Sequence, residues 1–148
     1  MPTYIDSSAL LRLCLGEGEL SLVERAFAQG PASSVLASVE VPCGIAARFH
    51  RGLLSGEERD VLFAAAAQTL APLVHIGVSQ TVREEAVSVA NHFLVRTLDA
   101  IHIATAVVMS RQQLRQGNIV RFCTADLRQA DAARALLGED RVDVVPPL

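Results

Sequence analysis

Residues 96–106 read Arg-Thr-Leu-Asp-Ala-Ile-His-Ile-Ala-Thr-Ala, and the rest of the chain is organised around them. Apolar and small residues surround the helix that this stretch predicts, from Leu98 to Met109, which is typical of a helix buried on more than one side. Asp99 stands in the first turn of that helix. An ionised carboxylate beside such a surface needs a cation or several hydrogen bonds, so we expect it to have partners elsewhere in the chain.

Three other acids occupy comparable positions. Asp6 and Asp126 each follow a short run of strand-forming residues, and Glu40 lies within the segment 38–41, which is otherwise small or apolar. In an open α/β sheet, the carboxyl ends of the strands and the starts of the following helices face one crevice, where ligands bind. We therefore expect Asp6, Asp99 and Asp126 at that edge of a sheet.

Short strands alternate with helices along the whole chain. The pattern predicts strands at residues 3–6, 32–35, 73–77, 119–124 and 142–145. It predicts helices at residues 7–15, 20–29, 38–51, 57–69, 82–92, 97–115 and 127–137. Ser7 or Ser8 can cap the first helix, and Ser79 can cap the fifth. This alternation is typical of a parallel sheet covered on both faces, so we predict a single α/β domain spanning residues 1–148.

The composition indicates a globular cytoplasmic protein. Hydrophobic residues make up 51% of the chain and charged residues 20%, which excludes a disordered class. No apolar run approaches the roughly 18 to 20 residues of a membrane span, and the first residues lack the pattern of a signal peptide. The cysteines, Cys14, Cys43 and Cys123, are odd in number and widely spaced, so we expect buried free thiols rather than disulfides or a metal knuckle.

All 13 basic residues are arginine, and no lysine occurs. This excludes sites built on a phosphate-binding lysine, a Schiff base, or the lysine partner of a phospho-aspartate. The formal charge of -3 does not suggest a nucleic-acid-binding protein. If four of the 16 acids hold divalent metal, however, 12 acids remain against 13 arginines, so the charge balance permits binding of a nucleic acid.

Four segments, taken in order, resemble the PIN domain and within it the VapC-type toxins of toxin-antitoxin pairs. They are residues 4–10, 39–40, 97–106 and 124–127. The resemblance implies a PIN-like three-layer α/β/α sandwich with a short, mainly parallel central sheet. It also implies an endoribonuclease that depends on Mg²⁺ or Mn²⁺, forms a homodimer and is silenced by a cognate VapB-like antitoxin.

The resemblance carries the family's acidic positions onto Asp6, Glu40, Asp99 and Asp126. Asp6, Asp99 and Asp126 would hold the metal directly or through water, because Mg²⁺ prefers oxygen ligands. Glu40 would ligate metal or orient the attacking water. Ser8 and Thr124 would donate hydrogen bonds that fix the carboxylates.

Several alternatives stay open from the residues alone. Asp6 and Asp126 could be helix N-caps, and Asp99 could serve only the helix dipole. His102 could touch substrate or lie in the core, and Arg96 could contact RNA, dock on a partner or be solvated.

The function has alternatives too. The protein could be a catalytically silent module that binds RNA or protein, or a phosphatase or deoxyribonuclease using the same acids.

For the antitoxin, we expect an arm whose arginine enters the acidic crevice while an apolar stretch covers residues 8–15 and 20–29.

Overall fold

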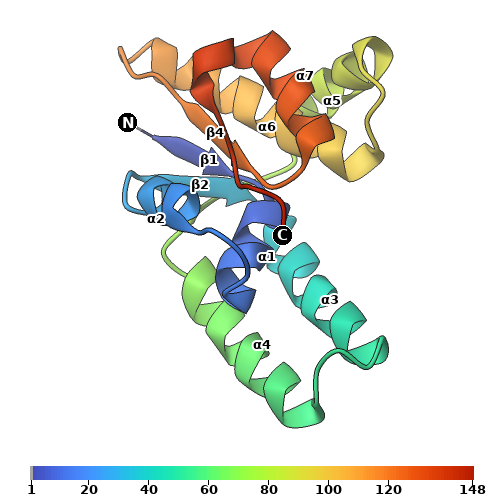
Figure 1. The fold of residues 1–148 in the computed structure, drawn as a ribbon. Helices are drawn as coiled ribbons and strands as arrows, with labels where there is room; N and C mark the ends of the chain where they lie inside the picture. Colours follow the sequence, from blue (N-terminus) through green and yellow to red (C-terminus); the bar gives the residue numbers. More distant parts are fainter. Residues whose placement is uncertain (1) are drawn as a thin grey trace.

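The computed structural model describes residues 2–148 and contains one five-stranded sheet (Figure 1). Its strands are β1 (Thr3–Ile5), β2 (Pro31–Ser34), β3 (Val74–Ile76), β4 (Arg121–Thr124) and β5 (Val142–Val144). They lie in the order β3-β2-β1-β4-β5, and every pair is parallel. The predicted parallel sheet is therefore confirmed, with β1 and β4 side by side at its centre.

Helices cover both faces of the sheet, as the three-layer prediction requires (Figure 1). One face carries α1 (Ser7–Leu15), α2 (Ser21–Phe27), α3 (Ala37–His50) and α4 (Gly56–Leu70). The other carries α5 (Gln80–His92), α6 (Thr97–Leu114) and α7 (Leu127–Leu137), and the short 3-10 helix η1 (Glu139–Arg141) precedes β5. The α/β/α sandwich is confirmed.

The alternation of side chains along the central strands builds two cores. Tyr4 and Phe122 point to the α5–α7 face, where their rings stack at 5.5 Å between centroids. Ile5 and Cys123, the next residue on each strand, point to the face of α1–α4. Helix α6 lies in the first core and is buried over most of its length, as its apolar circumference predicted.

The predicted boundaries hold to within a few residues, with one wrong cap. Neither Ser7 nor Ser8 caps α1, because the side chain of Asp6 accepts the hydrogen bond from the backbone N–H of Ala9. Ser79 caps α5 as predicted. Helix α2 is shorter than expected, and β4 begins at Arg121 rather than at residue 119.

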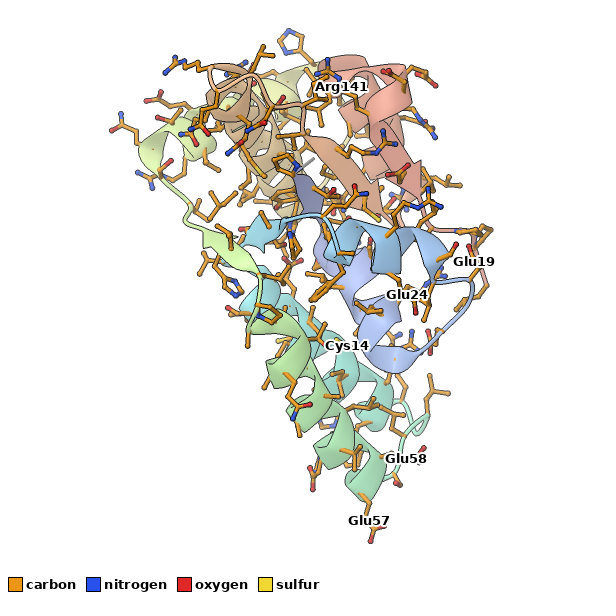
Figure 2. The ribbon with its side chains drawn as sticks, turned by 90° about the vertical axis from the view of Figure 1, so that its left-hand side faces the viewer. Cys14, Glu19, Glu24, Glu57, Glu58 and Arg141 are labelled. Carbon is orange, nitrogen blue, oxygen red and sulfur yellow. The ribbon has the colours of Figure 1, made fainter. Side chains whose placement is uncertain are left out.

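Helices α3 and α4 form a hairpin that extends away from the sheet (Figure 1). Figure 2 shows Glu57 and Glu58 at its tip, far from Arg141 at the opposite end of the molecule. In the middle of α3, a Cβ on Gly44 would lie 2.7 Å from Leu11 Cδ2, so α3 packs closely against α1 at this glycine and a larger residue would require the Leu11 side chain to move. That approach sets the start of α3, and with it Glu40, against the start of α1.

Cys14, Cys43 and Cys123 are all free, as predicted. Only Cys123 is buried, so the expectation of buried thiols is wrong for the exposed Cys43, and Cys14 is only partly buried. Within residues 2–148, no single helix is long and apolar enough to cross a membrane. The pair α5 and α6, bent by 117°, meets the length and composition criterion only when both are counted together.

Candidate active site

The four acids lie near the carboxyl ends of β1 and β4. Asp6 and Asp126 follow these two neighbouring strands, and Asp99 stands in the first turn of α6. Glu40 lies in the first turn of α3, after β2. The topology therefore brings residues from four distant parts of the sequence to the edge at which open α/β sheets bind ligands.

Asp6 is fully buried and held by three donors. Ser8 Oγ donates to Oδ1 at 2.7 Å, the N–H of Ala9 donates to Oδ1 at 3.0 Å, and Thr124 Oγ1 donates to Oδ2 at 2.6 Å. Burial nevertheless raises the pKa of the Asp6 carboxyl, and these hydrogen bonds only partly offset it. The contacts expected of Ser8 and Thr124 are present, and both converge on Asp6.

Thr124 also connects Asp6 to Asp126. Its Oγ1 accepts the backbone N–H of Asp126 at 3.0 Å while donating to Asp6. The Asp126 carboxylate in turn caps α7 by accepting the N–H of Arg128 at 2.9 Å. Asp6 and Asp126 are thus both helix N-caps, and each keeps carboxylate lone pairs beyond those used for the cap.

Asp99 is held between one buried donor and one exposed donor. The buried Gln129 donates from Nε2 to Asp99 Oδ1 at 2.9 Å, and Arg96 Nε donates to Oδ2 at 3.2 Å. The same guanidinium lies 3.9 Å from Asp126 Oδ2. Its side chain is 74% exposed, so the pairing contributes little to stability, but one cationic group reaches both carboxylates.

Glu40 is anchored by two side chains from other elements. Ser7 Oγ donates to Oε2 at 3.0 Å, and His102 Nε2 lies 2.6 Å from Oε1. The ring of His102 is fully buried, and its Nδ1 lies 2.6 Å from the hydroxyl of Tyr4. His102 is therefore a core residue that joins the first turn of α3 to the central strand β1. Within residues 2–148, no hydrogen bond or ion pair joins Glu40 directly to the three aspartates.

The hydrogen-bond donors and acceptors that link Tyr4, His102 and Glu40 fit one arrangement. Burial, together with the charge of Asp6, raises the pKa of the Tyr4 phenol far above its usual value, so the hydroxyl keeps its proton. That oxygen accepts the N–H of Ser34 at 3.1 Å, and its own proton is available to donate to His102 Nδ1. In this arrangement the ring proton lies on Nε2 and is donated to Glu40.

Within residues 2–148, no group of three or more His, Cys, Asp or Glu side chains is arranged to hold a metal ion. The chemistry of the donor set nevertheless suits a hard divalent cation, because all four groups are carboxylates. The guanidinium of Arg96 lies between two of them, with Nε at 3.2 Å from Asp99 and Nη2 at 3.9 Å from Asp126. Binding a metal here would require these carboxylates to exchange their present partners.

Sequence reasoning missed three contributors to this site: Tyr4, Gln129 and the role of His102. One indication for Gln129 was present in the sequence: it lies four residues before Ala133 and eight before Leu137, on the buried face of α7, where a polar residue needs a hydrogen-bond partner. The side-chain Oε1 of Gln129 is a buried atom without a hydrogen-bond partner in the described residues. The bond between His102 and Glu40 spans 62 positions and has no local signature.

The raised pKa of Asp6 makes the stability of the protein depend on pH. A raised folded pKa means that the folded state binds the proton more tightly than the unfolded state, so stability falls as pH rises from about 4 through the folded pKa. Asp6→Asn removes the cost of burying an ionised carboxylate and keeps a side chain that can cap α1. We expect the metal-free variant to be more stable than the native protein at pH 7, with the difference shrinking toward pH 4, in urea unfolding at several pH values.

Asp131→Asn provides the matched control, because it also removes one negative charge but from an exposed position on α7. It should leave the pH dependence of unfolding close to that of the native chain. A native-like pH profile for Asp6→Asn would show that burial of Asp6 does not destabilise the folded state.

Comparisons with known proteins agree with this architecture. Residues 3–135 match the family model of the PIN domain. The chain is 35% identical over 135 residues to Ribonuclease VapC46 of Mycobacterium tuberculosis, an alignment that covers 90% of this chain and 91% of the relative. A chain from a toxin-antitoxin complex of Klebsiella pneumoniae has the same fold, with a TM-score of 0.66, 21% identity and 99% of both chains covered.

Proposed function

The chain belongs to the PIN domain family, and from this premise we propose that it is a metal-dependent endoribonuclease, the toxin of a VapBC-type toxin-antitoxin pair. The likeness to Ribonuclease VapC46 extends over nine-tenths of both chains and supports a nuclease that hydrolyses RNA phosphodiesters. The proposed site consists of Asp6, Glu40, Asp99 and Asp126.

The observation that carries this proposal is the pairing of Arg96 with two carboxylates. Its guanidinium contacts Asp99 at 3.2 Å and lies 3.9 Å from Asp126, while Thr124 links Asp126 to Asp6. An edge that assembles acidic side chains around one cationic group is suited to Mg²⁺ or Mn²⁺, which would take the place of the guanidinium. Asp6, Asp99 and Asp126 would hold the ion directly or through water.

A bound divalent ion would supply an acidified water and relieve the negative charge on the phosphate. The chain's own residues supply orientation. Ser8 and Thr124 fix both oxygens of Asp6, and Gln129 fixes Asp99 from the buried side. His102 and Ser7 hold Glu40 in place to orient the attacking water or to act as a further ligand.

We also propose two protein partners. A VapB-like antitoxin would place a cationic side chain at the acids and an apolar segment on a neighbouring surface. A hollow of about 480 Å³ beside the end of α1 offers apolar surface to that segment from Leu15, Leu54 and Leu62, and its rim also carries Glu17, Glu57 and Glu58. The sequence predicted a groove on residues 8–15 and 20–29, but the second wall of this hollow comes from α4 and not from α2. A homodimer would bury exposed apolar side chains such as Val87 on α5 and Leu98 on α6.

One experiment compares three substrates and two metal conditions. We expect the purified chain to cleave RNA in the presence of Mn²⁺ or Mg²⁺ and to lose cleavage with a chelator, with single-stranded DNA and a phosphomonoester left uncleaved. Millimolar Mn²⁺ should also raise the melting temperature, because a ligand that binds only the folded state stabilises it. The shift should shrink toward acidic pH as the carboxylates take up protons.

The other outcomes have distinct meanings. RNA binding without cleavage under any metal condition would identify a silent binding module. Cleavage of DNA or of the phosphomonoester in preference to RNA would replace the ribonuclease proposal. A melting temperature unmoved by Mn²⁺ at neutral pH, with no binding in calorimetry, would exclude the four acids as a metal site. Cleavage should also disappear when a co-expressed antitoxin co-purifies with the chain.

A further inference from the structure

A cavity of about 420 Å³ opens beside the acidic edge, where the C-terminal segment runs past α1 (Figure 1). Its walls come from α1, α3, the start of α7 and residues 145–147. Two residues of the proposed site, Ser8 and Asp126, form part of its lining. Three arginines also line it, and we call this hollow the arginine pocket: Arg12, Arg48 and Arg128.

The arginine pocket carries positive charge that the protein does not neutralise. Arg48 forms an ion pair with Glu17, in which its Nη2 donates at 2.9 Å. Arg12 donates from Nη1 to the backbone carbonyl of Pro146 at 2.9 Å, and Arg128 is exposed at the start of α7. Within residues 2–148, neither Arg12 nor Arg128 forms an ion pair. Two guanidinium charges therefore face the cavity without a carboxylate partner.

We propose that the arginine pocket binds a phosphate of the RNA strand next to the phosphate that is cleaved. This inference rests on the proposed ribonuclease function and assigns the path of the substrate across the surface. A strand whose scissile phosphate lies at Asp6 and Asp126 must carry its next phosphate away from these acids. The arginine pocket shares Asp126 with the acidic edge, so it lies directly on such a path.

The chemistry of the lining fits a nucleotide. Guanidinium groups donate two parallel hydrogen bonds to a phosphate, a geometry that a point charge cannot provide. Arg12 is half-buried and tied to the C-terminal segment, so less conformational entropy is lost on binding. Leu11, Leu127 and Val145 give the cavity apolar surface against which a sugar or base can pack.

The decisive measurement is RNA binding by the Asp99→Asn protein, which removes cleavage from the readout. A fluorescent single-stranded RNA is titrated by anisotropy over a series of NaCl concentrations. We expect Arg12→Ala and Arg128→Ala each to weaken binding about three- to tenfold and to reduce the slope of log affinity against log salt by about 0.7, the value for one phosphate contact on a single strand. Arg128→Lys should restore the salt slope, because the charge is kept, but only part of the affinity, because the paired hydrogen bonds of the guanidinium are lost.

Arg115→Ala is the matched control, because Arg115 is an exposed arginine at the end of α6 and lies outside the arginine pocket. It should leave both affinity and salt slope unchanged. In the otherwise native protein, Arg128→Ala should raise the KM for RNA cleavage with little change in kcat, as expected for a contact made equally in the ground and transition states. Circular dichroism verifies that each variant is folded.

The possible failures can be told apart. Arginine-dependent RNA binding by a chain that never cleaves RNA would refute the proposed function and leave the arginine pocket standing. RNA cleavage with affinity and salt slope unaffected by Arg12→Ala and Arg128→Ala would refute the pocket alone. A fluorescent oligoglutamate that binds as tightly as RNA, with the same dependence on these arginines, would show that the pocket takes an acidic peptide and would overturn the inference.

Discussion

Asp99→Asn should abolish RNA cleavage and leave the protein folded. The substitution removes one negative charge from the proposed metal site and conserves the volume of a side chain that is 12% exposed. Loss of a group that only supports a metal ligand typically costs 10- to 100-fold in activity, so loss of a ligand should cost about 100-fold or more. The measurement is the initial rate of RNA cleavage in Mn²⁺, alongside urea unfolding of the same preparation.

Stability should change little, by about 1 kcal/mol or less. The new amide can still accept the hydrogen bond from Gln129 through its oxygen. The pairing with Arg96 is lost, but that side chain is 74% exposed and turns to solvent at small cost. Asp131→Asn, on the exposed face of α7, is the control for charge removal and should cleave at the native rate. Native activity in Asp99→Asn would exclude Asp99 from the reaction.

Hydrophobic periodicity was enough to predict the layers of the fold. The short runs at Tyr4–Ile5 and Phe122–Cys123 alternate between the two cores, and the apolar circumference of α6 matches its burial. Cap chemistry was less decisive. Asp6, Ser7 and Ser8 can each accept the capping hydrogen bond, and only the three-dimensional path from β1 into α1 selects Asp6.

The acids of the site could be predicted, but only some of their partners could. Asp6 and Asp126 follow strands that the sequence locates, so their meeting at one edge follows from a parallel sheet. The contacts of Ser8 and Thr124 were expected from the family resemblance, whereas Gln129 with Asp99 and His102 with Glu40 join residues far apart in sequence and carry no local signature. Arg96 is an exception, since it lies three residues before Asp99 at ordinary helical spacing.

His102→Leu should be the most destabilising substitution near the site. Leucine conserves the volume of the buried ring but removes both 2.6 Å hydrogen bonds, to Tyr4 and to Glu40. The hydroxyl of Tyr4, a fully buried residue, would lose its contact with His102, and the loss should total about 2 to 4 kcal/mol in urea unfolding. RNA cleavage should fall about tenfold or more, since Ser7 alone would then hold Glu40.

A double-mutant cycle with Tyr4→Phe separates the hydrogen bond from simple packing. Because Tyr4→Phe removes the stranded hydroxyl, the double variant should lose less stability than the sum of the two single variants, by about 1 kcal/mol or more. His102→Gln should recover part of both stability and cleavage, since an amide can accept from Tyr4 and donate to Glu40. ¹⁵N NMR of the native imidazole should show the proton on Nε2. Additive single losses, or a proton on Nδ1, would contradict the chain from Tyr4 through His102 to Glu40.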